Sequence, residues 1–250
     1  MKTEELAKLF TRRNIRRLAA LFLIKTALKV LLFLFFFNSS WELFSADLYT
    51  CSFGQGKWKP EEWRMVKSWR WDYAGEWVQK SDFIENKVPG DATPKELFSK
   101  RAGETYTSMV LDKKFRGNLT IACDMSFIDR MAPGIMIAAE PVKDEKGRWE
   151  YRDHFEVIFY DKGVNVWHHY FVDGKQVWKK KAFLLEDFKP EKVYKLSVNI
   201  SFTPKGPVLT MKVNDGAPFG YMEEALPKEY YLGIVGCEGV NRFYDLKISK

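Results

Sequence analysis

The sequence predicts an all-β fold, a two-sheet antiparallel β-sandwich. From Asp47 onward the 250-residue chain consists of short runs rich in Val, Ile, Phe, Tyr and Trp, separated by turn residues. No convincing amphipathic helix interrupts these runs. From Tyr194 to Phe202 the side chains at even positions are apolar and those at odd positions are polar. This alternation is typical of a strand that buries one face and exposes the other.

The runs predict a dozen strands. In chain order they are Leu48 to Phe53, Glu76 to Gln79, Thr105 to Leu111, Asn118 to Phe127, Gly134 to Ala139, Trp149 to Tyr160, Val164 to Val172, Gln176 to Lys180, Val193 to Phe202, Val208 to Val213, Tyr230 to Val235 and Arg242 to Ile248. Turn residues separate them, as in Asp161-Lys162-Gly163 and Asp173-Gly174. Glu61 to Arg70 and Thr93 to Arg101 are predicted as helical turns or long loops. No linker divides the strands, so residues 47–250 are predicted to form one domain.

Residues 1–46 are predicted to be a signal peptide or an N-terminal membrane anchor. Eight Lys or Arg residues precede the apolar run Val30 to Phe37. This run is too short to span a bilayer, which needs about 20 residues, and a longer span would bury Lys25 and Lys29. Basic residues before a short apolar run are typical of a secretory signal. We therefore expect the domain to be exported and to contact a membrane only through this segment.

The charge balance argues against nucleic acid as a partner. Residues 1–46 hold eight basic and three acidic residues, a net of +5, so the remaining 204 residues carry only +2 of the total of +7. That is too little for a phosphate-binding surface. The three cysteines, Cys51, Cys123 and Cys237, allow one disulfide or none. No Cys/His spacing resembles a zinc site.

All three histidines lie between Trp149 and Val172, which makes this region the best candidate for a site. If Trp149 to Tyr160 is one strand, its apolar residues 155, 157 and 159 face the core. Arg152, His154 and Glu156 then project from the opposite face. We expect His154 and Glu156 to be exposed together, two residues apart.

The turn at Asp161-Lys162-Gly163 decides which side chains lie beside this pair, because a one-residue slip exchanges the faces of a strand. A two-residue loop pairs His154 with His169 and Glu156 with Trp167, and it places Val164 and Val166 over the core. A type I turn with Gly163 as a bulge residue instead brings His168 and Tyr170 beside the pair. The two-residue loop is preferred because it separates polar from apolar side chains cleanly.

The predicted ligand-binding residues are His154, Glu156, Trp167, His169 and Arg152, and the predicted ligand is a carbohydrate. An aromatic ring stacks on the apolar face of a sugar while nearby polar groups bind its hydroxyls. The alternative is a solvated sheet face without a ligand. Glycosidases normally need two carboxyl groups across the bond, and the strand offers none beside Glu156. If the protein is an enzyme, Glu156 or His154 would be the general acid/base, with a partner from another strand.

Three segments and three tryptophans carry a resemblance to a known superfamily. They are the hairpin Asp153-His-Phe-Glu-Val-Ile-Phe-Tyr160, the strand Leu209-Thr-Met-Lys-Val-Asn214, the ending Gly233-Ile-Val-Gly-Cys-Glu-Gly-Val-Asn-Arg-Phe-Tyr-Asp-Leu-Lys-Ile248, and Trp69, Trp71 and Trp77. Together they resemble the concanavalin A-like lectin/glucanase jelly rolls over roughly Leu48 to Lys250. The pattern is also similar to exported LamG-like domains and to domains named for 3-keto-disaccharide hydrolysis. This resemblance implies a jelly roll that binds carbohydrate or processes polysaccharide outside the cytoplasm.

The resemblance also bears on chemistry and on metals. The catalytic strand of laminarinase-like members looks like Glu-x-Asp-x-x-Glu, whereas this chain has Asp153-His154-Phe155-Glu156-Val157-Ile158. This departure argues against retaining glucanase chemistry. Such enzymes often hold a structural calcium ion through an Asp of the last strand, and the resemblance implies that Asp245 could match it, with Asp47 as a further oxygen ligand.

The sequence therefore predicts an exported β-sandwich that binds a glycan or polysaccharide. The first alternative is an enzyme on the same fold that cleaves glycosidic bonds, either a glycoside hydrolase or a 3-keto-glycoside hydrolase-like protein. The second alternative is a structural or adhesive domain without a small ligand. Apart from the calcium ion, no cofactor is expected.

Overall fold

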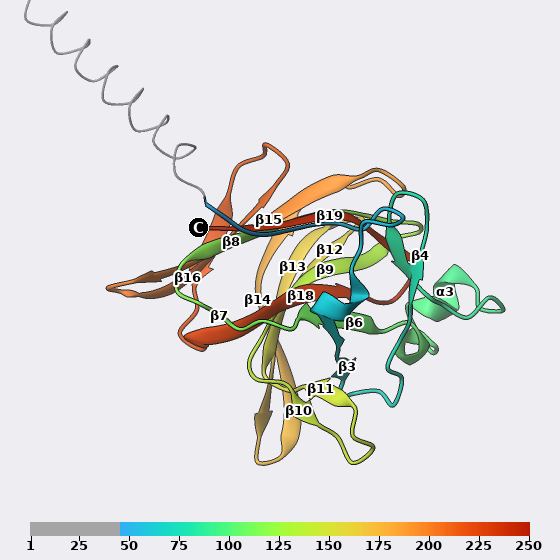
Figure 1. The fold of residues 1–250 in the computed structure, drawn as a ribbon, viewed down its shortest axis with the longest axis horizontal. Coiled ribbons are helices and arrows are strands. Elements are labelled where there is room, and N and C mark those ends of the chain that lie inside the picture. Colours follow the sequence, from blue (N-terminus) through green and yellow to red (C-terminus); the bar gives the residue numbers. More distant parts are fainter. Residues whose placement is uncertain (1–45) are drawn as a thin grey trace, which may run out of the picture. The chain divides into compact units, whose positions relative to one another are not determined.

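Two eight-stranded antiparallel sheets dominate the computed structural model, which describes residues 46–250 (Figure 1). Sheet I contains, in spatial order, β17 (Phe219–Met222), β16 (Gly206–Val213), β15 (Tyr194–Thr203), β8 (Leu119–Phe127), β19 (Asn241–Ser249), β5 (Ile84–Asn86) and β4 (Trp77–Gln79), with β1 (Asp47–Ser52) paired to β19. The predicted leader, apart from Ala46, lies outside the described residues. The prediction of an all-β sandwich is confirmed.

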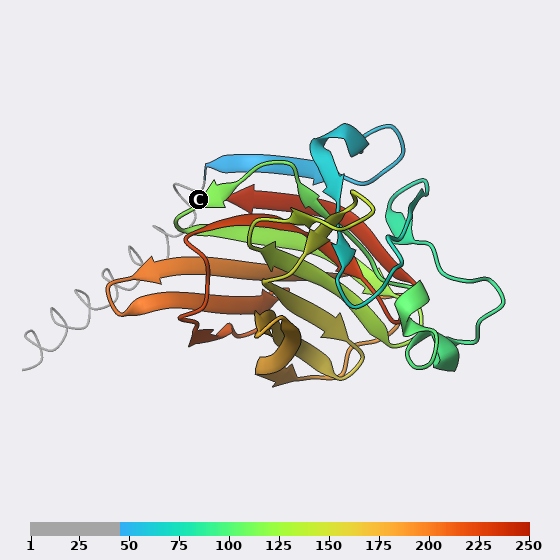
Figure 2. The same ribbon diagram turned by 90° about the horizontal axis from the view of Figure 1, so that it is seen from below.

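Sheet II carries the region of the three histidines. It contains, in spatial order, β14 (Lys175–Leu185), β13 (Gly163–Val172), β12 (His154–Tyr160), β9 (Met131–Ala138), β18 (Glu229–Gly236), β6 (Thr107–Leu111) and β2 (Trp63–Met65), with β7 (Phe115–Arg116) paired to β18. Figure 2 gives a second view of these strands, in which those of the two sheets overlap.

A third, small sheet and three short helices complete the described elements. The small sheet consists of β10 (Val142–Lys143), β11 (Trp149–Tyr151) and β3 (Lys67–Ser68), and β11 runs parallel to β3. The helices are η1 (Pro60–Glu62), α3 (Pro94–Leu97) and η2 (Ala102–Glu104). In α3, Thr93 caps the N-terminus and Glu96 bonds back to the Thr93 backbone, which forms a capping box. No helix among residues 46–250 is long and apolar enough to cross a membrane.

The structure corrects two of the predicted elements. The expected strand Trp149 to Tyr160 is broken at Arg152 and Asp153, because β11 leaves sheet II and pairs with β10 and β3. The expected helical turn at Glu61 to Arg70 is mostly strand, since only Pro60–Glu62 is helical and β2 and β3 follow it. The helical turn expected at Thr93 to Arg101 is present as α3.

The main core lies between the two sheets. Phe155, Val157 and Phe159 of β12 are fully buried there, as predicted, and Val164 and Val166 of β13 join them. Phe159 packs against Phe127, Phe188 and Tyr194. Burying apolar surface between the sheets is the main stabilising contribution to such a fold.

A second buried cluster covers the other face of sheet II. It combines sheet residues such as Met136 and Ile158 with residues from outside that sheet, among them Val66, Tyr106 and Tyr151. Residues 66–71, Tyr106, the small sheet and the loop between β18 and β19 thus lie over this face, which we call the outer face of sheet II. The outer face is consequently much less open to solvent than a simple two-layer sandwich predicts.

Candidate functional site

The register of the β12–β13 hairpin brings the predicted site residues together. His154 lies opposite His169, Glu156 lies opposite Trp167, and Tyr160 lies opposite Gly163. The loop therefore has two residues, which confirms the preferred register and rules out the bulged alternative. Gly163 has φ 142°, and a Cβ atom there would lie 1.8 Å from the Leu184 carbonyl oxygen. Only glycine fits this position, which fixes the hairpin against β14.

The expected exposure of His154 and Glu156 is wrong. Their relative exposure is 1% and 3%, and they are paired with each other beneath the covering segments. The alternation of β12 places them correctly on the face opposite Phe155. Alternation cannot tell whether another part of the chain covers that face, and here Tyr151 and Tyr106 do so.

The buried pair is part of a compact polar cluster, His154, Glu156 and His169. His154 Nε2 lies 3.3 Å from Glu156 Oε1, and His169 Nε2 lies 3.5 Å from Glu156 Oε2. The two imidazole rings stack with centroids 4.6 Å apart, and Tyr151 packs edge-on against His154 at 4.2 Å. His154 Nδ1 donates to the Arg152 carbonyl oxygen at 3.1 Å, which fixes the orientation of the ring.

Burial and the neighbouring rings shift the pKa values in this cluster. Burial lowers the pKa of His154, because charging a desolvated imidazole is unfavourable. Burial alone would raise the pKa of Glu156, but His169 and His154 lower it overall to well below its ordinary value. Glu156 is therefore an ionised carboxylate at the floor of the site.

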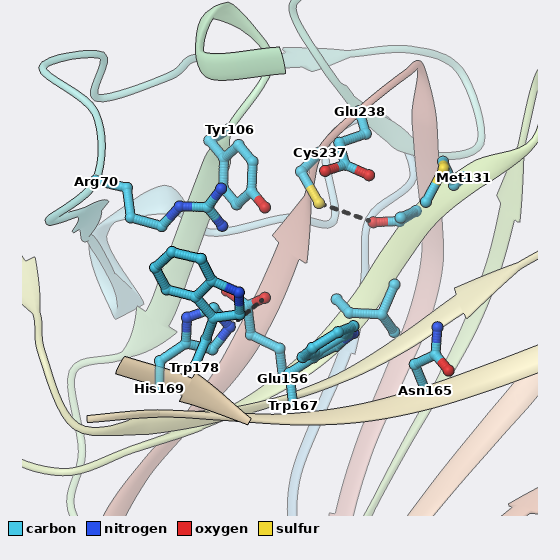
Figure 3. Close-up of a pocket in the computed structure, with 12 residues that line it drawn as sticks. Arg70, Tyr106, Met131, Glu156, Asn165, Trp167, His169, Trp178, Cys237 and Glu238 are labelled. Carbon is cyan, nitrogen blue, oxygen red and sulfur yellow. Dashed lines mark hydrogen bonds and ion pairs between the residues drawn. The ribbon is translucent and has the colours of Figure 1, made fainter. Parts of the chain in front are cut away.

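A cavity of about 240 Å³ opens above this carboxylate (Figure 3). Trp167 and Trp178 form one side of it, while Cys237 and Glu238 lie on the opposite side. Its other polar and aromatic lining residues are Arg70, Tyr106, Asn165, Glu156 and His169. Trp178 is 54% exposed, so one wall of the cavity is a partly solvated indole ring. Arg70 lies over this ring at 5.4 Å, within cation–π range.

Several residues that line the cavity were not among the predicted site residues, although the sequence contains a signal for some of them. Asn165, Trp167 and His169 follow the period of two on β13, so the same alternation points to Asn165. Trp178 lies directly opposite His169 across the next hairpin, and the turn at Asp173-Gly174 would have predicted this pairing. Arg70 and Tyr106 come from loops and short strands, and no local pattern in the sequence indicates them.

Glu238 was also missed, and its backbone is unusual. It has φ 56°, a left-handed conformation that is uncommon outside glycine. Its backbone N–H donates to Thr105 Oγ1 at 2.7 Å. Burial and the nearby Glu156 raise the pKa of its carboxyl group. The cavity therefore contains one carboxyl group with a lowered pKa and one with a raised pKa.

The cysteine in the cavity is buried and hydrogen-bonded. Burial raises the pKa of the Cys237 thiol well above its ordinary value, and its Sγ donates to the Ala132 carbonyl oxygen at 3.6 Å. All three cysteines of the chain, including Cys51 and Cys123, are free. The sequence allowed one disulfide or none, and the structure has none.

Arg152 is the predicted site residue that the structure separates from the others. Its side chain is exposed, pairs with Glu150 at 3.1 Å and does not line the cavity. The break before β12 is the reason, because it ends the alternation that placed Arg152 beside His154. Only its carbonyl oxygen contributes, as the acceptor for His154.

The structure also separates the two residues expected to share a calcium ion. Asp47 pairs with Ser249 and Asp245 pairs with Ser52, so they lie at opposite ends of the β1–β19 ladder, about 16 Å apart at the usual strand rise. Calcium ligands must lie within 2.3 to 2.6 Å of the ion. Asp47 instead pairs with Lys247 at 2.8 Å.

Comparison with known proteins identifies the fold. No protein-family model and no curated protein sequence matches the chain. Among solved structures, a galectin-like protein of unknown function from Bacillus subtilis is 10% identical and covers 82% of this chain and 97% of its own, with a TM-score of 0.55.

Two further solved structures have the same fold. The carbohydrate-binding module CBM66 from Bacillus subtilis is 11% identical and covers 76% of this chain and 96% of its own, with a TM-score of 0.51. Lectin II from Ulex europaeus is 7% identical and covers 82% of this chain and 99% of its own, with a TM-score of 0.51. The chain therefore has the jelly-roll sandwich of concanavalin A-like lectins, as the resemblance implies.

Proposed function

We propose that the cavity on the outer face of sheet II binds a carbohydrate. The observation that carries this proposal is the combination of Trp167 and Trp178 on one wall with the hydrogen-bonding groups of Arg70, Asn165 and Glu238 around them. An indole ring offers an apolar face for a sugar ring, and the polar groups suit its hydroxyls. The volume of about 240 Å³ suits a ligand smaller than a typical drug, so we expect one or two sugar residues to be enclosed.

The structural neighbours support the same class of ligand. One of them is a carbohydrate-binding module, and another is a lectin complexed with galactose, with a TM-score of 0.50 and 8% identity. The site proposed here is defined by the residues of this chain and not by those of its neighbours.

A glycan array with the full-length chain, followed by calorimetry with the best ligand, tests the proposal. We expect Trp178→Ala and Trp167→Ala each to weaken binding about tenfold, since an aromatic contact contributes about 0.5 to 1.5 kcal/mol. Trp69→Ala is the matched control, because Trp69 is 41% exposed but lies outside the cavity, where it packs on Phe171. Absence of binding on the array, or an equal loss in Trp69→Ala, would contradict the proposal.

We also propose that the domain acts outside the cytoplasm. The basic residues followed by Val30 to Phe37 support export. Cell fractionation and N-terminal sequencing of the isolated protein test this point. Recovery in the cytoplasm with Met1 or Lys2 at the N-terminus would contradict it.

The second candidate function is cleavage of a glycosidic bond in the same cavity. It is favoured by the opposite pKa shifts of Glu156 and Glu238, since such pairs commonly divide the acid and base roles. Glu238, and not His154, would then be the acid, because His154 does not line the cavity. Reducing-sugar release from bound glycans tests this candidate, and unchanged release by Glu238→Gln would exclude Glu238 as the acid.

A further inference from the structure

Three metal-ligand side chains converge at the floor of the cavity. Among the described residues, His154, Glu156 and His169 can each offer one donor atom such that all three atoms lie within 4.8 Å of one another. His154 and Glu156 are two residues apart on one strand face, and His169 lies directly opposite His154 on the next strand. Residues directly opposite each other have Cβ atoms about 4.5 to 5.5 Å apart, which is close enough for His154 and His169 to share one ion.

The hydrogen positions in the cluster bring a histidine lone pair against Glu156. His154 Nδ1 faces the Arg152 carbonyl oxygen at 3.1 Å and must therefore carry a hydrogen. If the ring is neutral, its Nε2 presents a lone pair to Glu156 Oε1 at 3.3 Å. Two electron-rich atoms then face each other, which is unfavourable. A proton between the two atoms, or a metal ion held by both, removes this conflict.

The surroundings favour a metal ion over a proton. Within residues 46–250, no Lys or Arg forms an ion pair with Glu156, whose partners are His154 and His169. His169 Nδ1 is buried and has no hydrogen-bond partner. Buried charged groups in proteins are normally paired or coordinate metals.

We propose that His154, Glu156 and His169 bind one divalent transition metal ion of the zinc class. Two imidazole nitrogens and one carboxylate oxygen form a known three-residue ligand set of zinc sites that keep a coordination position open. Calcium prefers six to eight oxygen ligands and does not suit this set. The bond from His154 Nδ1 to the Arg152 carbonyl oxygen matches the outer contact that orients metal-bound histidines.

The open position would face the cavity, because Glu156 and His169 line it while His154 lies behind them. The site does not depend on sugar binding. The absence of zinc-like Cys/His spacing in the sequence does not contradict it, because these ligands meet across two strands.

The test uses the full-length chain and the metal alone. After dialysis against a chelator, the protein is titrated with Zn²⁺ by calorimetry and with Co²⁺ by visible absorption. We expect one ion per chain and a cobalt spectrum typical of low coordination number. Glu156→Gln and His169→Gln are expected to weaken Zn²⁺ binding at least about 100-fold, since even outer contacts account for 10- to 100-fold.

His168→Gln is the matched control. His168 is the neighbouring histidine on β13, is also buried, and pairs with Asp153 at 3.0 Å on the other face of the sheet. It should bind Zn²⁺ as the wild type does. If the wild-type chain binds neither metal, or if His168→Gln loses as much affinity as His169→Gln, the proposal is overturned. The titration of the wild-type chain tests metal binding even if a variant of the cluster does not fold. Glycan binding is measured separately in the presence of chelator, so a failure of the metal proposal can be distinguished from a failure of the proposed carbohydrate binding.

Discussion

The two faces of β12 are equally buried but are built differently. Phe155, Val157 and Phe159 pack against apolar side chains of the opposite sheet. His154 and Glu156, one residue away in the sequence, are just as inaccessible, yet they are held by polar contacts beneath a cover of loops and short strands. The first face depends on shape and apolar area, and the second depends on paired charges.

Burial therefore affects stability in two different ways in the same strand. A buried apolar side chain stabilises the fold wherever it packs well. A buried carboxylate costs free energy unless its partners are present, and Glu156 depends on His154 and His169 for this pairing. Substitutions on the two faces of β12 are therefore expected to have different effects.

The largest expected effect is on the inner face. Phe159→Ala removes a fully buried ring that contacts Phe127, Phe188 and Tyr194. We expect the free energy of unfolding to fall by about 3 to 5 kcal/mol, measured by urea denaturation. Ligand affinity of the folded fraction should be unchanged. A loss below about 1 kcal/mol would mean that the inner face is not the main stabilising core.

A somewhat smaller loss of stability is expected from a substitution in the small sheet that lies over the outer face. Lys67 of β3 pairs with Glu150 of β11 at 2.8 Å, and both side chains are buried. Lys67→Met leaves Glu150 with Arg152 as its partner, so we expect a loss of about 3 kcal/mol, at the low end for a broken buried pair. Thermal and urea unfolding measure it.

The double variant Lys67→Met/Glu150→Leu is the control for this pair. Replacing both charges by apolar groups is often neutral, so most of the lost stability should return. If the double variant is less stable than the single one, the packing of β3 and β11 over the outer face does not depend on this charge pair. That result would contradict the proposed difference between the two faces.

The smallest effect lies outside both faces. The Lys100 ammonium and the capping contacts with Thr93 lower the pKa of Glu96 from 4.5 to about 2. A lowered pKa in the folded state contributes stability above pH 4.5, and this contribution is lost as the pH falls toward 2. We expect the difference in stability between wild type and Glu96→Gln to be small at pH 7 and to vanish below pH 2. A difference that grows on acidification would contradict this assignment.

The sequence was sufficient to predict the sandwich and the hairpin register. Both predictions depend on local patterns that the structure retains. These patterns are the alternation from Tyr194 to Phe202 and the burial of Val164 and Val166 on one face of β13. The exposure of His154 and the position of Arg152 were predicted wrongly because both depend on β11 leaving the sheet. Arg70, Tyr106 and Glu238 reach the cavity through long-range packing, for which no short sequence pattern exists.

The position of β19 has a consequence for how the molecule is assembled. This last strand lies inside sheet I, between β8 on one side and β1 and β5 on the other. Sheet I is therefore incomplete until residues 241–249 have been synthesised. Deleting Asn241–Ser249 would split the sheet rather than trim an edge, and pairing across such a sequence separation is slow to form. Folding of this domain is consequently expected to be completed only after β19 has left the ribosome.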